Sequence, residues 1–178
     1  RGNRLSRGVT LPLGSLALQD ASQKSMKKAE RIVKAALAPL TELKAGAGRT
    51  FYAVGGTWRA LARIHIIQSG YPLHVMHGYT LPAADALTFV RRVRRLAAAN
   101  TLANVEEIAE ARQPLLAYAA LVLEHVIRIA EPKDIVFSTY GVREGLMHEM
   151  LSETERTKDG LICAAQTLNE LLSRSSHH

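Results

Sequence analysis

The chain has 178 residues, enough for one domain with a buried core and a short appendage. Apolar residues make up 47% and charged residues 22%, a globular composition that excludes an intrinsically disordered chain. The net charge of +7 favours an anionic partner such as a phosphate chain, a nucleotide, nucleic acid or lipid headgroups.

Membrane insertion and disulfide bonding are not expected. The longest uncharged apolar run, residues 115–123, is too short to span a bilayer. The first residues lack an apolar stretch followed by a cleavage site, so we expect no secretory signal. The single cysteine, Cys163, excludes an intrachain disulfide and fits a cytoplasmic protein.

The first 48 residues predict a hairpin and a helix. Residues 4–18 contain two short β-favouring runs, the second ending at Gly14, and predict an antiparallel hairpin. Residues 23–44 place apolar side chains on one helical face, and Pro39 should kink or break that helix. The sequence Gly-Ala-Gly at 46–48 then ends the helix.

A strand, a turn of small residues and a helix occur twice. Residues 51–57 read FYAVGGT and precede a helix to about Gln68, and residues 135–141 read IVFSTYG and precede VREGLMHEML. Strands separated by helices pair in parallel, so we predict an α/β fold: a mainly parallel sheet, with an antiparallel hairpin at its start and helices on both faces. Both turns then lie at one edge of the sheet, where such folds bind ligands. A tight turn without a ligand is the alternative.

Two helices are expected between these units. The first begins near Pro82 and carries RRVRR at residues 91–95 between apolar positions. These arginines are either the solvated face of a surface helix or a surface for an anion. No nucleic-acid motif or aromatic stacking platform accompanies them, so we do not expect nucleic acid as the partner. The second helix has a capping box at Asn104 and Glu107, is interrupted by Pro114 and extends to about Ala130.

Four residues invite a chemical role but have simpler explanations. His74 and His77 lack neighbouring Cys, Asp or Glu residues that would complete a zinc site, so we interpret them as a loop pair. Cys163 lies in an apolar segment without a neighbouring histidine and is expected to be a packed thiol. Trp58 follows the first glycine turn, and we expect it to pack rather than to stack on a base.

Four segments, in order, resemble the exopolyphosphatase and guanosine pentaphosphate phosphatase (Ppx/GppA) family. TLPLGSLAL resembles its S-L-P-L-G strand, FYAVGGTWRALARIH its strand-GGT-helix segment, and STYGVREGLMHEML its serine-x-x-G-[LV]-R-[ED]-G-[LV] signature. EARQPLLAYAALV stands where the family has R-A-D and a helix, with Gln113-Pro114 in place of Ala-Asp. Together the segments cover most of residues 8–151.

The resemblance implies an actin-like ATPase (ribonuclease H-like) fold and a bacterial hydrolase. Such an enzyme releases terminal phosphate from inorganic polyphosphate, guanosine pentaphosphate or both. Residues 1–152 would be its second actin-like domain, and residues 153–178 the start of a C-terminal helical region. The catalytic glutamate is expected upstream of this fragment, so the full-length parent would be the active enzyme and the fragment alone inactive. For the intact enzyme we expect Mg²⁺ as cofactor, a cytoplasmic location and a homodimer.

The resemblance also indicates which residues bind phosphate. Gly55, Gly56 and Thr57 would supply backbone N–H groups and a hydroxyl, while Arg143 would act as a bidentate clamp. Arg112 stands at the position of the family's R-A-D arginine and is a further candidate, with a surface arginine near a helix kink as the alternative.

Alternatives remain for the clamp and for the activity. The alternative for Arg143 is an ion pair with Glu144 or Glu149. Glu144 is assigned no catalytic role, because a glutamate in the first turn of a helix is commonly structural. No metal ligand is assigned within the fragment. A sensor of the same fold, which binds polyphosphate or a nucleotide without hydrolysing it, is the alternative function.

Overall fold

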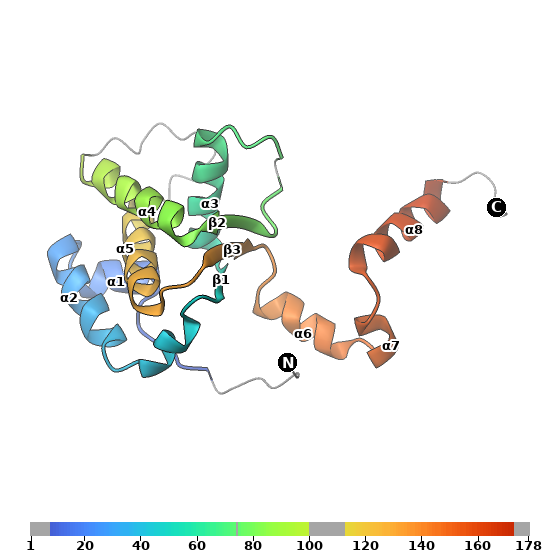
Figure 1. The fold of residues 1–178 in the computed structure, drawn as a ribbon, viewed down its shortest axis with the longest axis horizontal. Coiled ribbons are helices and arrows are strands. Elements are labelled where there is room, and N and C mark those ends of the chain that lie inside the picture. The colour runs from blue at the N-terminus through green and yellow to red at the C-terminus, as the bar shows by residue number, and fades with distance from the viewer. Residues whose placement is uncertain (1–7, 74, 100–112, 173–178) are drawn as a thin grey trace. The chain divides into compact units, whose positions relative to one another are not determined.

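The computed structural model describes residues 8–73, 75–99 and 113–172, and the chain divides into two compact units, 1–139 and 140–178. The first unit contains three strands among helices (Figure 1). Its elements are α1 (Ser15–Ala21), α2 (Met26–Leu37), the 3-10 helix η1 (Thr41–Gly46), β1 (Thr50–Val54), α3 (Gly56–Gln68), β2 (Tyr79–Pro82), α4 (Ala83–Ala98), α5 (Gln113–Ala130) and β3 (Asp134–Ser138). The second unit consists of α6 (Val142–Met150), α7 (Glu153–Arg156) and α8 (Gly160–Leu172).

The sheet of the first unit has the order β1-β3-β2. β1 pairs with β3 in parallel, with Val54 opposite Ser138, so the carboxyl ends of these strands lie at one edge of the sheet. This confirms the parallel pair that the two strand-turn-helix segments predict. β2 pairs with β3 antiparallel, with Tyr79 opposite Phe137, so the sheet is mixed rather than mainly parallel.

The hairpin expected at residues 4–18 is wrong where the structure describes it. Residues 8–14 form no strand and residues 15–21 form α1. Pro12 would remove a donor from a ladder, and Leu13 is buried against helices without strand pairing. The antiparallel partner is β2 instead, a short edge strand within a segment that the sequence indicated to be a loop.

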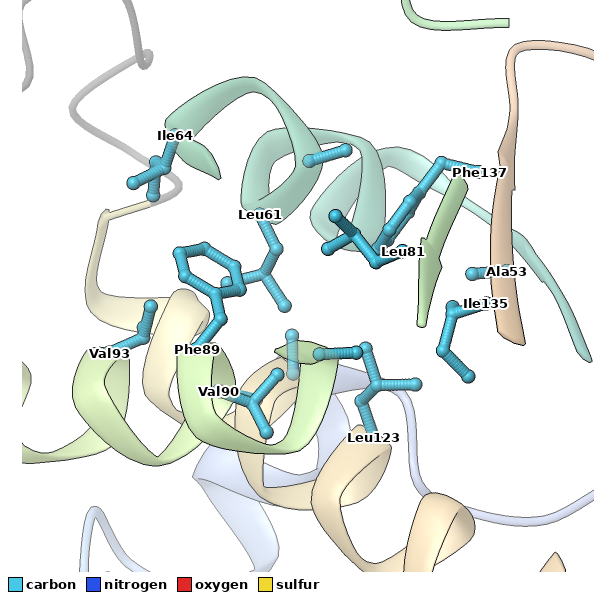
Figure 2. Packing of buried hydrophobic residues seen from close by; sticks show 14 of the residues in the cluster. Ala53, Leu61, Ile64, Leu81, Phe89, Val90, Val93, Leu123, Ile135 and Phe137 are labelled. Carbon is cyan, nitrogen blue, oxygen red and sulfur yellow. The ribbon is translucent and has the colours of Figure 1, made fainter. Parts of the chain in front are cut away.

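Among the residues of the first unit that the structure describes, helices cover one face of the sheet rather than both. Side chains on that face, including Ala53, Ile135 and Phe137, are buried against α3, α4 and α5 (Figure 2). On the other face Tyr52 is 65% exposed and Val54 45%. Because side chains alternate along a strand, β1 shows one buried and one open face.

Helix α5 is the centre of the unit. One side packs with the sheet, α3 and α4 through residues such as Leu123, and the other packs with α1 and α2 through residues such as Leu121. This two-sided burial explains the uncharged run at 115–123, which belongs to a core helix. None of the helices that the structure describes is sufficiently long and apolar to cross a membrane.

Most predicted helices are present, with differences at their ends. α2 ends at Leu37, before Pro39, as a proline break predicts. α5 is described from Gln113 to Ala130, and the stretch before Pro114 that this proline was expected to interrupt lies outside the described residues. The expected capping box at Asn104 and Glu107 lies outside the described residues.

Candidate functional site

The first glycine turn has a backbone that requires glycine. Gly55 lies between β1 and α3 with φ 137° and ψ 154°, a conformation almost restricted to glycine. A Cβ built on Gly55 would meet nothing within 4 Å, so conformation rather than space selects the residue. The first turn of α3 therefore begins directly at the end of a parallel strand. Its leading N–H groups have no acceptor within the helix and are available to an anion.

A cavity of about 360 Å³ adjoins this turn. Gly55, Gly56 and Thr57 line it together with Gly14 and Ser15, from the start of α1. Apolar side chains line the remainder of the cavity, and they come from the loop before α1 and from α2, β1, α3 and α5: Leu11, Leu13, Leu37, Val54, Trp58, Ala119, Val122 and Val126. Two segments about forty residues apart in sequence thus meet at one cavity. Its polar groups are backbone amides and two hydroxyls, a set suited to binding an oxyanion.

Two long-range hydrogen bonds fix the turn. Trp58 donates its ring N–H to the carbonyl of Ala119 on α5 at 3.3 Å, and its ring meets Phe51 edge-on at 5.8 Å between centroids. Trp58 therefore packs, as expected. Arg59 donates to the carbonyl of Thr139 at 3.1 Å, which ties α3 to the end of β3. The first turn of α3 is thus anchored to the core helix and to the neighbouring strand.

In the second unit, Arg143 and Glu144 lie in the first turn of α6. The N–H of Gly141 donates to Oε2 of Glu144 at 2.6 Å, so this glutamate caps the helix. The side chain of Arg143 is exposed and forms no ion pair with any residue that the structure describes, Glu144 and Glu149 included. The ion-pair alternative is therefore not realised, and phosphate binding by Arg143 stays a prediction.

Other candidate residues have no assigned place in the cavity. Arg112 and His74 lie outside the described residues. His77 accepts a hydrogen bond through Nδ1 from the backbone of Thr139 at 3.4 Å. Across residues 8–73, 75–99 and 113–172, no three His, Cys, Asp or Glu side chains are grouped as metal ligands. Mg²⁺ stays an expectation for the intact enzyme, and we derive no step through that ion.

Gly14 and Ser15 were not candidates from the sequence. Both lie in TLPLGSLAL, a segment that resembled the family but was interpreted as a strand. The resemblance marked the segment, while its position beside Thr57 depends on tertiary packing.

The chain resembles one known protein family and several solved structures. The model of the Ppx/GppA phosphatase family matches residues 4–154. A solved Ppx/GppA family member from Aquifex aeolicus is 16% identical, with a TM-score of 0.61 over 89% of this chain and 52% of that one. The type II variant of the Aquifex aeolicus Ppx/GppA phosphatase is 17% identical, with a TM-score of 0.58 over 83% of this chain and 51% of that one.

A third structure, an exopolyphosphatase-like protein, is 19% identical, with a TM-score of 0.56 over 75% of this chain and 46% of that one. No match was found among curated protein sequences. The chain spans about half the length of the three structures, and at these identities the likeness shows an actin-like ATPase type of fold. Because the family model covers residues 4–154 of the 178, the chain belongs to the Ppx/GppA phosphatase family.

Proposed function

We propose that this chain is the phosphate-binding part of a phosphohydrolase that releases terminal phosphate from inorganic polyphosphate, guanosine pentaphosphate or both. The observation that carries the proposal is the Gly55–Thr57 turn, which joins a parallel strand to a helix N-terminus and lines one cavity with Gly14 and Ser15. Membership of a phosphatase family gives that cavity its expected ligand.

The chemistry of phosphoanhydride hydrolysis is mostly positioning and charge stabilisation. Water attacks the terminal phosphorus, the bridging oxygen leaves with the shortened chain, and negative charge spreads over the equatorial oxygens. The amides of Gly56 and Thr57 would hold two such oxygens at the positive end of the α3 dipole. The hydroxyl of Thr57 would donate a further hydrogen bond.

Arg143, in the second unit, is proposed separately as a cationic phosphate ligand. A cation in the first turn of a helix is unfavourable by a few tenths of a kcal/mol unless an anion compensates. A phosphate oxygen pair is a suitable anion, because a guanidinium binds it through two parallel hydrogen bonds. Arg112 is a second proposed ligand by its place in the family pattern.

We further propose that residues 1–152 act as the second actin-like domain of the full-length enzyme. The carboxylate that orients the attacking water would then come from the other half, which accords with the chain spanning about half of its structural relatives. Mg²⁺ stays an expectation for the full-length enzyme, to be tested by removal with a chelator.

The test is phosphate release from polyphosphate and from guanosine pentaphosphate, measured separately for the full-length protein and for residues 1–178 alone. We expect release by the full-length protein with at least one substrate and none by the fragment. Tight binding of both compounds without release by the full-length protein would favour the sensor. If the fragment alone releases phosphate, and a point substitution within it abolishes that release, the proposal that the carboxylate comes from the other half is contradicted.

A further inference from the structure

A second polar cavity, of about 650 Å³, lies among α4, α5 and the start of α2. Helices α4 and α5 lie side by side (Figure 1). Four arginines and one carboxylate dominate the lining, which consists of Met26, Arg91, Arg94, Arg95, Ala98, Glu124 and Arg128. The cavity is therefore basic, unlike the cavity beside the glycine turn, whose lining has no charged side chain.

Glu124 is the centre of this basic cavity. Its side chain is only 4% exposed and accepts from Nε of Arg91 at 3.2 Å, from Arg128 at 2.6 Å and from Arg94. Burial by itself raises the pKa of the Glu124 carboxyl, but the hydrogen bonds from Arg94, Arg128 and Arg91 together outweigh it and lower that pKa to about 2. The carboxylate thus stays ionised and holds three guanidinium groups around the cavity.

Positive charge exceeds negative charge here. The second carboxylate nearby, Glu30, is shared between Lys34 at 2.9 Å and Arg94 at 3.5 Å. The side chain of Arg95 has no hydrogen-bond or ion-pair partner among the residues that the structure describes, although it lines the cavity. The lining itself therefore has four arginines and one carboxylate, and mutual repulsion among these cations is relieved by an additional anion.

Some N–H groups of the arginines at this cavity have no acceptor among the described residues. A guanidinium carries five N–H groups, and Arg91 directs only its Nε toward Glu124. Nε of Arg94 is buried and lacks a partner among the described residues. A tetrahedral oxyanion with several acceptor oxygens would match the remaining N–H groups of Arg91 and Arg95 and the open volume beside them.

The basic cavity is separate from the turn cavity. Val122 and Val126 of α5 line the turn cavity, whereas Glu124 and Arg128 line the basic one. Residues two apart on a helix are about 200° apart around its axis, so the cavities open on opposite sides of α5. A ligand in one does not occupy the other.

We propose that the basic cavity is a second anion site, which binds an inorganic phosphoanion away from the glycine turn. The ligand is either free orthophosphate or a phosphate unit of a polyphosphate chain. An inorganic anion is favoured over a nucleotide or RNA because no aromatic side chain lines the cavity to stack on a base. The inference stands apart from the proposed hydrolysis, since it concerns binding alone.

The experiment is an amide chemical-shift titration of the ¹⁵N-labelled 178-residue chain. Tripolyphosphate and orthophosphate are added in separate series, with an RNA oligonucleotide as a third. We expect the amides of residues 91–98 and of Arg128 to shift with tripolyphosphate. An equal response to orthophosphate identifies a single-phosphate site, and a much weaker response identifies a chain site. The amides of Gly56 and Thr57 report on binding at the turn in the same spectra. Binding at the basic cavity and binding at the turn are therefore tested independently.

Arg95→Gln and Arg92→Gln are the matched variants. Both arginines are exposed on α4, but Arg92 lines a different cavity with Asp85 and His65. Neither pairs with Glu124, so melting temperatures should match that of the wild type. We expect Arg95→Gln to weaken tripolyphosphate binding at residues 91–98 by roughly fivefold or more and Arg92→Gln to leave it unchanged. The proposal is overturned if the α4 amides do not shift with either phosphate compound. It is also overturned if Arg95→Gln binds tripolyphosphate as tightly as the wild type, or if only RNA produces a response.

Discussion

Gly55 allows the turn between β1 and α3 to take a backbone conformation that other residues rarely adopt. Its φ of 137° is strained for any residue with a Cβ, and the space around it is empty. We therefore expect Gly55→Ala to lower the free energy of unfolding by about 1–3 kcal/mol through backbone strain alone. Gly14→Ala is the matched control, since Gly14 also faces empty space but has φ −57°, which alanine adopts freely. Its effect should stay within about 0.5 kcal/mol, because lost capping and reduced chain entropy offset each other.

Urea unfolding of the two alanine variants checks this comparison. Equal stabilities for Gly55→Ala and Gly14→Ala would contradict a glycine requirement at the turn. Such a result would mean that residue 55 adopts a backbone conformation that alanine tolerates as readily as glycine does.

Arg143 is predicted to act in the reaction rather than in folding. Its side chain is exposed and forms no ion pair within the described part of the chain, so its removal should cost little stability. In the full-length protein, Arg143→Ala should lower kcat/KM for phosphate release at least tenfold, equivalent to about 1.4 kcal/mol. Arg143→Lys should recover only part of the rate, because lysine keeps the charge and loses the bidentate geometry.

The exposed Arg31 of α2 supplies a control substitution, Arg31→Ala, which should leave turnover unchanged. A lowered melting temperature of Arg143→Ala combined with normal kinetics of the folded enzyme would make Arg143 a structural residue.

At the scale of elements, Glu124 joins α4 to α5 and makes their packing sensitive to acid. The pKa of its carboxyl is about 2 in the folded protein against an ordinary 4.5. A lowered folded-state pKa means that the stabilisation is complete above about pH 4.5 and is lost as the pH falls toward 2. We expect Glu124→Gln to lower the free energy of unfolding at pH 7 by roughly 2–3 kcal/mol, allowing for the half-exposed Arg91 and Arg128.

Urea unfolding at pH 7, 4.5 and 3 measures this difference. The gap between wild type and Glu124→Gln should be similar at pH 7 and 4.5 and clearly smaller at pH 3. The exposed Glu42 of η1 offers a control, Glu42→Gln, with little effect at any of these values. A gap that is independent of pH would show that packing, and not the ionised carboxylate, stabilises the α4–α5 contact.

Elements with strong local signals were predictable from the sequence, and those that depend on tertiary contacts were not. β1 and β3 consist of β-favouring residues ahead of glycine turns, and α3 and α4 begin where the sequence indicated. β2 has only four residues and includes Pro82, which an edge strand tolerates but a sequence pattern does not favour. α1 was not predicted: the expected second strand ended at Gly14, just before it, and burial of Leu18 against other helices selects the helix.

The candidate sites also divide into one that a local sequence signal predicts and one that depends on tertiary contacts. The Gly55–Thr57 turn could be found from its motif, since strand, turn and helix are contiguous. The partners of Glu124 could not, because Arg91 and Arg94 are 33 and 30 residues distant in sequence. The only local sign was Arg128, four residues after Glu124 in an otherwise apolar helix.

At the scale of the whole molecule, family membership, the fold and the turn cavity support one central claim: the Gly55–Thr57 turn holds a substrate phosphate. The hydroxyl of Thr57 is the one side-chain group of that turn that can be removed without changing its shape. Thr57→Val keeps the volume and the backbone amides. Thr80→Val is the control, because Thr80 is exposed on β2 and its hydroxyl donates only to the nearby carbonyl of Gly78.

The measurement is kcat/KM for phosphate release from polyphosphate by the full-length protein and these two variants. A hydrogen bond to a charged phosphate is worth about 1.5–3 kcal/mol, so Thr57→Val should be roughly 10-fold to 100-fold slower and Thr80→Val unchanged. Equal kcat/KM for wild type and Thr57→Val, with both proteins folded, would contradict a role for this turn in holding the substrate.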